Sequence, residues 1–166
     1  MGHPIHPMLI VFPLGLLATA VIFDIAFLIT GNAELDVAAF WCMAAGIVGG
    51  LLAALFGAWD WLHIPSGTRA KRIGAMHGAG NVVVVGLFLV SWLLRLGDTD
   101  QPSSVASIFS FAAILLALGT AWLGGELVMR LGIGVDPGAH PDAPSSLSGE
   151  AADASSRDAR IAAERS

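Results

Sequence analysis

Long runs of apolar residues, separated by short polar segments, make up most of the chain. Four runs cover about residues 8–30, 37–62, 73–96 and 105–130, and each is near the length of about 20 residues that a helix needs to cross a bilayer. The first and third runs are apolar around the whole circumference of a helix, so lipid can surround them. Because backbone groups in lipid must find partners within the protein, these runs predict membrane-spanning helices.

The segments between the runs read GNAELD, IPSGTRAKR and GDTDQPSS. They are rich in Gly, Pro, Asn, Asp and Ser, which end helices, and they are short enough to make neighbouring helices antiparallel. The pattern predicts an all-α integral membrane four-helix bundle over residues 1–135. From residue 136 to residue 166 the sequence is a mixture of Pro, Ala, Ser and Asp without an apolar period, and it predicts a disordered tail.

The composition agrees with this interpretation. Hydrophobic residues make up 55% of the chain and charged residues 13%, against roughly 25% charged residues in soluble domains. These values exclude a soluble enzyme and a disordered protein, and they predict membrane lipid as a partner. A sequence pI near 5.3 without a basic stripe argues against binding to nucleic acid. The single cysteine, Cys42, excludes an internal disulfide and a four-cysteine zinc site.

The charges between the runs predict the orientation in the membrane, because Lys and Arg are retained on the cytoplasmic side. Basic residues follow the second run at 69–72 and close the fourth run at Arg130. The other two connections carry acidic residues and a single Arg95. We therefore expect both termini and the IPSGTRAKR segment in the cytoplasm.

Most of the unusual polar residues fall at this same cytoplasmic end. They are His3, His6, Asp60, His63, His77, Asn81, Glu126 and Arg130. Asp24 is the exception, because it lies near the outer end of the first run, where we expect partial hydration or a polar neighbour to satisfy it. Pro13 removes a backbone hydrogen bond inside the first run and predicts a bend or a restart of that helix.

Two of these segments have the spacing of metal ligands. In HPIHP, the imidazoles of His3 and His6 stand three residues apart and either chelate a metal ion or lie unliganded among the lipid headgroups. Asp60 and His63 share one face of a helix, a spacing found in carboxylate-bridged metal sites of helix bundles. The alternative for Asp60 is a charge pair with the basic residues of the next segment, at Arg69 or Lys71.

The start of the third run offers the best cofactor candidates. His77 and Asn81 share a helix face, and the glycines around them clear a path for a partner helix or a flat cofactor. Such small residues also serve plain helix packing, but an ionisable residue within a membrane is a functional-site hypothesis by default. Glu126 either forms an ion pair with Arg130, four residues on, or orients His77 through its second ring nitrogen.

Three segments in order carry a family resemblance: HPIHPMLIVFPLG, FGAWDWLHIPSGTRAKRIGAMHGAGNVVVV and GGELVMRLGIGVD. They resemble the signatures of a bacterial membrane protein family, domain of unknown function 2231, over residues 1–136. The resemblance implies a four-span protein of the bacterial plasma (inner) membrane. Some relatives are joined to a Rieske-type iron-sulfur domain, which implies a redox setting and a redox protein partner. Many relatives differ from this chain at Val11 and His63. The better site candidates that remain are His6, Asp60, His77, Asn81 and Glu126.

These observations lead to one functional hypothesis and two alternatives. The hypothesis is an electron-transfer protein in which His6, His77 and Asn81 hold a cofactor such as haem b, or in which a transition metal binds among the residues of a second set. That metal set is His6, Asp60, His77 and Glu126. The first alternative is a non-catalytic scaffold or accessory subunit that docks a partner or anionic lipid through its basic segment. The second is a small transporter, which would need to assemble as a homo-oligomer. The sequence carries no Walker loop, dinucleotide fingerprint, nucleophile elbow or metalloprotease motif, and it assigns no reaction.

Overall fold

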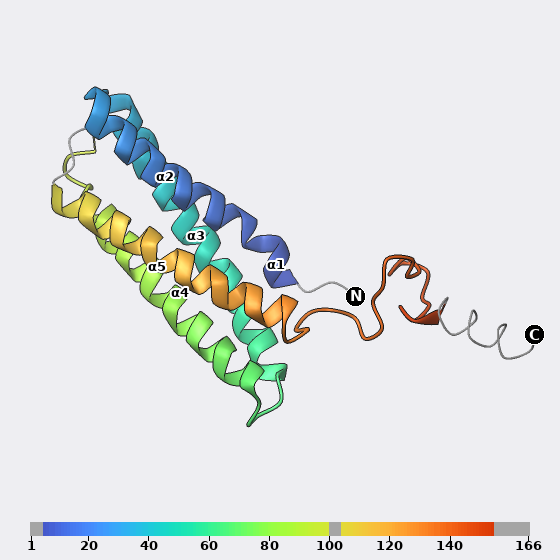
Figure 1. The fold of residues 1–166 in the computed structure, drawn as a ribbon. Helices are drawn as coiled ribbons and strands as arrows, with labels where there is room; N and C mark the ends of the chain where they lie inside the picture. The colour runs from blue at the N-terminus through green and yellow to red at the C-terminus, as the bar shows by residue number, and fades with distance from the viewer. Residues whose placement is uncertain (1–4, 100–103, 155–166) are drawn as a thin grey trace, which may run out of the picture.

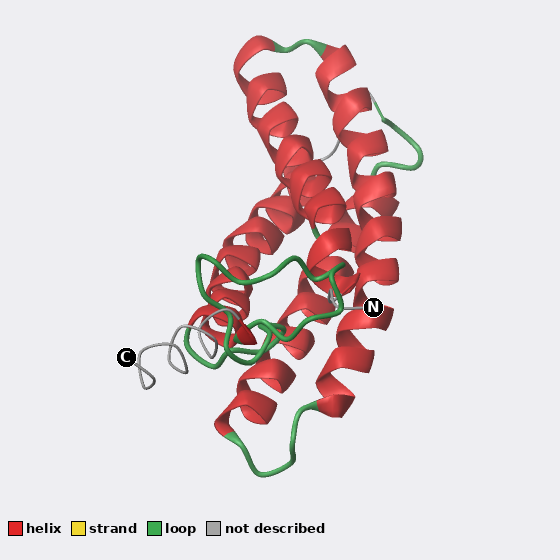
Figure 2. Ribbon diagram, turned by 90° about the vertical axis from the view of Figure 1, so that its right-hand side faces the viewer, coloured by secondary structure: helices red, strands yellow, loops and turns green. Residues whose placement is uncertain are grey.

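The described residues of the chain, 5–99 and 104–154 in a computed structural model, form helices and no strand. Among them, four helical stretches are long and apolar enough to cross a membrane (Figures 1 and 2). This confirms the all-α membrane bundle predicted from the apolar runs. The helices are α1 (Ile5–Leu9), which shares its span with α2 (Val11–Thr30), then α3 (Ala33–His63), α4 (Arg69–Leu93) and α5 (Ser104–Met129).

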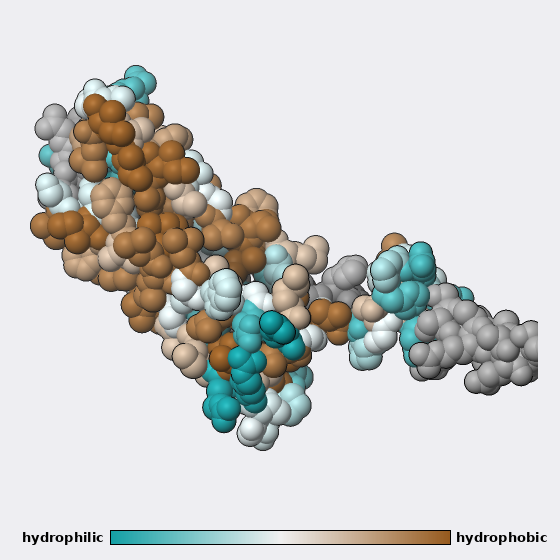
Figure 3. Space-filling model, viewed as in Figure 1, coloured by the Kyte–Doolittle hydropathy of each residue, from teal (hydrophilic) through white to brown (hydrophobic). Residues whose placement is uncertain are grey.

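The bundle has two ends of opposite character (Figure 1). The start of α1, the loop between α3 and α4, and the end of α5 share one end, which we call the basic end because it carries Arg69, Lys71 and Arg72. The α2–α3 turn and the α4–α5 connection share the other end, which we call the acidic end after the exposed Glu34 and Asp98. Hydrophilic atoms gather at the basic end in Figure 3, while apolar surface covers the helices.

Local side-chain chemistry explains where the helices begin and end. Gly31 ends α2 with a φ of 68°, and its N–H donates to Phe27 O. Asn32 then starts α3, because its side-chain oxygen accepts a hydrogen bond from the Glu34 N–H. At the other end of the bundle, the Thr68 hydroxyl oxygen accepts from the Lys71 N–H and starts α4.

Pro13 separates α1 from α2, as the sequence predicts. Proline has no N–H, so Leu9 O lacks the donor that an unbroken helix would supply four residues later. The helix restarts at Val11, and α1 carries His6 in a short segment of its own. Pro13 is buried against α3, where a Cβ on Gly49 would lie 3.3 Å from its ring.

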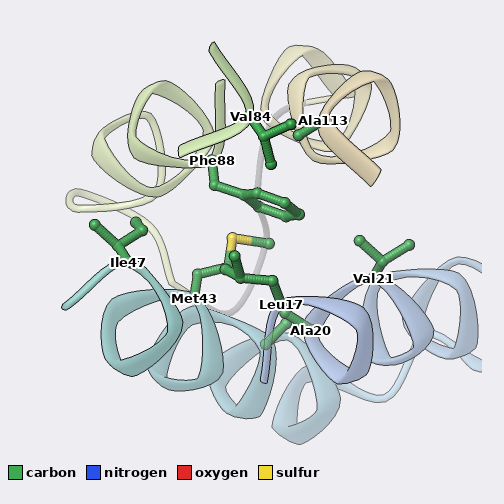
Figure 4. Packing of buried hydrophobic residues seen from close by; sticks show 9 residues of the cluster. Leu17, Ala20, Val21, Met43, Ile47, Val84, Phe88 and Ala113 are labelled. Carbon is green, nitrogen blue, oxygen red and sulfur yellow. The ribbon is translucent and has the colours of Figure 1, made fainter. Parts of the chain in front are cut away.

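A compact apolar core joins the four spans in the half of the bundle nearer the acidic end. Figure 4 shows the Phe88 ring of α4 and the Met43 side chain of α3 meeting at its centre, and both are fully buried. The outward faces are apolar as well: Leu55, Leu115 and Trp122 are each more than two-thirds exposed. Lipid therefore covers the bundle, and packing between helices holds it together.

The helices differ in extent from the runs read off the sequence. Helix α3 begins at Ala33, before the expected residue 37, because the acidic residues of its first turn belong to the helix rather than to the connection. Helix α4 begins at Arg69, before the expected residue 73, because the basic residues that follow the Thr68 cap form the first turn of the helix. Beyond α5, residues 136–153 form turns that lead away from the bundle (Figure 1), and the tail from residue 155 lies outside the described residues.

Candidate functional site

His6 and His77 meet at the basic end of the bundle. His6 lies on α1 and His77 on α4, and the centroids of their rings are 6.3 Å apart with an angle of 85° between the ring planes. Both side chains are half-buried. The structure therefore brings together two imidazoles from helices that are far apart in the sequence.

Each imidazole is held by a backbone carbonyl of a neighbouring helix. His6 Nδ1 lies 2.8 Å from Ala53 O of α3, and His77 Nδ1 lies 2.8 Å from Thr120 O of α5. A carbonyl oxygen only accepts, so Nδ1 carries the proton in both rings and donates it. In a neutral ring this leaves the lone pair on Nε2 available, which is the arrangement of a histidine that binds a metal.

A glycine lies four residues beyond each of these carbonyls and makes room for the ring. A Cβ at Gly57 would lie 2.9 Å from His6 Nδ1, and a Cβ at Gly124 would lie 3.0 Å from His77 Cε1. We call Ala53 with Gly57, and Thr120 with Gly124, the two carbonyl-glycine pairs. A larger residue at either glycine would force the imidazole to shift.

Asn81 fixes the orientation of the His77 ring. Its Nδ2 donates to His77 O over 3.0 Å, and its Oδ1 accepts from the Thr120 hydroxyl over 2.9 Å. The same Nδ2 lies 3.4 Å from Nδ1 and 3.2 Å from Nε2 of the His77 ring. A donor in the ring plane would approach one ring nitrogen much more closely than the other, so the near-equal distances place the amide over the ring face. Asn81 thus leaves the in-plane lone pair of Nε2 uncovered.

The remaining charged candidates have partners other than those expected from the sequence. Glu126 accepts a hydrogen bond from Arg69 Nη2 over 2.7 Å, rather than pairing with Arg130 or His77. The antiparallel packing of α4 and α5 brings Arg69 to this position. Since side-chain exposures are 53% for Arg69 and 23% for Glu126, solvent screens the pair, which contributes at most about 1 kcal/mol.

The two cations expected to pair with Asp60 are also engaged elsewhere. Arg69 belongs to Glu126, and Lys71 Nζ donates to Trp61 O over 2.6 Å while lying 4.0 Å above the Trp61 ring. The Trp61 indole N–H in turn donates to Lys71 O over 3.0 Å. These contacts tie α3 to α4 at the basic end.

The structure brings together only part of the metal set proposed from the sequence. Across residues 5–99 and 104–154, no group of three or more His, Cys, Asp or Glu side chains is arranged to hold a metal ion. Of His6, Asp60, His77 and Glu126, the two histidines meet. His63 packs on Trp59 instead, with its Nδ1–H bonded to Trp59 O over 2.8 Å. His3 lies outside the described residues.

A buried ion network at the acidic end was missed by the sequence analysis. Arg95 Nη1 lies 2.8 Å from Asp24 Oδ1 and 2.7 Å from Asp36 Oδ1, and Arg95 Nη2 donates to Asp24 Oδ2 over 2.9 Å. The Ser110 hydroxyl donates to the same Asp24 oxygen over 2.8 Å. All four residues are at most 1% exposed. The network joins α2, α3, α5 and the segment after α4.

Of the two expectations for Asp24, a polar neighbour is confirmed, since Arg95 and Ser110 bond to it, and partial hydration is wrong, because Asp24 is buried. The network also corrects the assignment of Asp36 and Arg95 as loop charges, because both lie inside the fold. The signal was present in the sequence, because a buried acid needs a cation and Arg95 is the one Lys or Arg between Arg72 and Arg130.

The comparison with family models gives one match, over residues 2–137, to the family described as Predicted membrane protein (DUF2231). The chain belongs to the DUF2231 family. The matched residues of this DUF2231 protein include all four spans, the histidine pair and the buried ion network. Comparisons with curated proteins and with solved structures gave no match.

Proposed function

We propose that this DUF2231 protein binds a haem between His6 and His77 and transfers electrons at the basic end of the bundle, on the cytoplasmic face of a bacterial plasma membrane. The observation that supports the proposal best is the histidine pair itself. Two imidazoles from different helices lie 6.3 Å apart, and both Nδ1–H groups are already bonded to carbonyls.

The donor set favours haem over a free metal ion. His6 and His77 would hold the haem iron through Nε2, because Nδ1 of each ring is bonded to a carbonyl. A free zinc or copper(II) ion requires further protein ligands, and in the described part of the chain the histidine pair has no third His, Cys, Asp or Glu in position. The porphyrin of haem supplies four nitrogens of its own and asks only for axial ligands.

The surroundings of the two rings serve this role. A hydrogen bond from Nδ1–H to a carbonyl fixes the tautomer of a ligating imidazole and raises its basicity. Asn81 and Thr120 hold the His77 ring from its face and its edge. Haem bound here would supply one-electron chemistry, and the polar basic end gives a redox partner protein a surface to approach.

The charge distribution supports the cytoplasmic orientation of this end. Arg95 is neutralised inside the fold by Asp24 and Asp36, so it does not count as a loop cation. The exposed basic residues then lie at the basic end, including Arg69 and Arg72. The rule that loops with Lys and Arg stay in the cytoplasm therefore favours placing both termini inside the cell.

A second candidate is a non-catalytic scaffold or accessory subunit. It draws on the contacts that tie the helices together at both ends, namely the Arg69–Glu126 pair, the Lys71–Trp61 contacts and the buried ion network. In that case the histidine pair is one more tie between helices, and replacing His77 would weaken the fold without removing a chromophore.

Protein extracted from haem-replete cells into mild detergent distinguishes the two candidate functions. The measurement is the absorption spectrum together with the haem and metal content of the same sample. We expect an intense haem band that is lost or shifted in His6→Ala and His77→Ala and kept in the control His63→Ala. A folded, colourless protein without bound iron would contradict haem binding and favour the scaffold.

A further inference from the structure

The two halves of the bundle repeat one pattern of key residues. His6 at the start of the first span and Asp24 near its end correspond to His77 and Arg95 in the third span. Asp24 and Arg95 are 71 positions apart, and the same shift carries His6 onto His77. Both pairs of equivalent residues meet in the structure, the histidines at the basic end and the ion pair at the acidic end.

The buried positions of the helices repeat in the same way. The shift that relates the histidines carries the buried residues of α2 onto buried residues of α4 and the segment after it. The pairs are Pro13 and Val84, Leu17 and Phe88, Ala20 and Ser91, and Asp24 and Arg95. A second constant shift relates α3 to α5, where the pairs are Ala39 and Ala106, Phe40 and Ser107, Met43 and Ser110, Gly46 and Ala113, and Ala53 and Thr120. The counterparts of the buried Val21 and Ile47 are Trp92 and Ile114, which pack against the same core.

The lipid-facing positions and the support of the histidines follow the same two shifts. Exposed residues of one half fall on exposed residues of the other. The pairs are Ile22 and Leu93, Trp41 and Ile108, Val48 and Leu115, and Leu55 and Trp122. The carbonyl-glycine pair under His6, Ala53 with Gly57, falls on the pair under His77, Thr120 with Gly124.

We propose that the four spans are two equivalent hairpins, α1–α2–α3 and α4–α5, related by a two-fold axis along the bundle, and that the ligand of the histidine pair lies on this axis between interchangeable imidazoles. Parallel repeats related by an axis along the membrane normal are an established way of building membrane proteins. The part about the ligand rests on the proposed function. The axis itself rests on the repeated burial pattern and on the contacts between equivalent residues, and it needs no ligand.

The two-fold axis determines how the two histidines of the site are placed relative to each other. Residues that are equivalent in the two hairpins and lie close to a two-fold axis must face each other, as His6 faces His77 and Asp24 faces Arg95. A ligand between the histidines then experiences the same support from both sides. The chemistry that suits such a site is a flat metal complex that both imidazoles would hold in the same way.

Spin-label distances test the axis without any ligand. In full-length protein with Cys42→Ala as background, one variant carries labels at Ile22→Cys and Leu115→Cys, and the other at Leu93→Cys and Val48→Cys. All four positions are exposed, and the second pair is the image of the first. We expect the distance between labels 22 and 115 to equal that between labels 93 and 48. In the same way, the distance within the first hairpin, between 22 and 48, should equal that within the second, between 93 and 115. Clearly different distances would overturn the axis.

Imidazole rescue tests whether the two ligands are interchangeable. His6→Gly and His77→Gly each remove one ring and open space for added imidazole. We expect the two variants to show the same loss of one axial ligand, and added imidazole to restore the wild-type spectrum in both with similar affinity. Rescue of only one variant would overturn equivalence. If wild-type protein binds no haem but the label distances agree, the proposed function and the ligand on the axis fail while the duplicated fold stands.

Discussion

The histidine pair and Asp24 of this DUF2231 protein bond to groups that lie outside their own helices. His6 and His77 bond to carbonyls of α3 and α5, and Asp24 bonds to Arg95 and Ser110. In lipid no water is available to take over these bonds, so a lost partner leaves an unsatisfied group in an apolar medium. The residue-scale predictions follow from this dependence.

Replacing Arg95 should cost more stability than replacing either acid. Arg95→Met leaves Asp24 and Asp36 as buried charges without their cation, and breaking a buried ion pair in this way costs about 3–5 kcal/mol. Asp24→Asn keeps the Arg95–Asp36 pair and should cost about 1.5–3 kcal/mol, as expected for lost hydrogen bonds to a charged group. Unfolding in detergent micelles measures both. A larger effect of Asp24→Asn would show that Arg95 is not the centre of the network.

Gly124→Ala should displace His77 while leaving the bundle folded. The added methyl group would lie 3.0 Å from His77 Cε1, so the ring must shift, which disturbs its hydrogen bond to Thr120 O. The readout is the nitrogen NMR spectrum of protein with labelled histidines, in which we expect loss of the Nδ1–H form for His77. Gly125→Ala is the matched control, because a Cβ there meets nothing within 4 Å. Identical spectra for the two variants would refute the role assigned to Gly124.

The sequence identified the residues of the histidine site better than their partners. His77 and Asn81 stood out because polar residues are rare in apolar runs, and His6 stood out because of its spacing to His3. Thr120 did not stand out, since its contribution to His77 is a backbone carbonyl, which every residue has. Asp36 and Arg95 were misplaced because charged residues next to a turn look like loop residues until the packing of the helices is known.

At the scale of helices, the sequence predicted the spans well and their ends less well. Apolar runs of this length leave little choice but helices. The ends were off at α3 and α4 because their first turns are charged while their caps, Asn32 and Thr68, lie further upstream. The restart of the first span at Val11 followed from Pro13, since a missing N–H has the same effect in any environment.

Pro13→Ala should straighten the first span and move His6. An alanine restores the N–H that bonds to Leu9 O, so α1 and α2 merge and the direction of α1 changes. We expect the Nδ1–H signal of His6 to be lost and that of His77 to remain. Pro7→Ala is the control, because Pro7 is exposed in α1. Loss of both histidine signals, or of neither, would contradict the link between the Pro13 break and the position of His6.

At the scale of the whole molecule, the buried ion network joins the helices at the acidic end and the histidine pair joins them at the basic end. The repeat that relates the two hairpins escaped the sequence analysis because equivalent positions share burial rather than residue type, as with Leu17 and Phe88. The equal spacing of His6 to Asp24 and of His77 to Arg95 was the available signal.

The orientation of the bundle is open to a direct test with reporter fusions. Reporters after Gly67 and after Asp136 should both report the cytoplasm, because the exposed basic residues lie at that end. A reporter inserted after Gly97 should report the opposite side. Arg72→Glu with Arg69→Glu should weaken this preference, whereas Arg95→Gln should not, since Arg95 is buried among acids. Reporters after Gly67 and Asp136 on different sides would exclude an even number of spans between the two points.

The most direct test of the account is the electron paramagnetic resonance spectrum of the ferric protein purified with its haem. We predict the low-spin signal of iron with two axial imidazoles in the wild type, and a high-spin signal when His6 or His77 is replaced by alanine. A high-spin wild type, or a low-spin signal that survives both substitutions, would contradict the claim that these two histidines hold the iron between them.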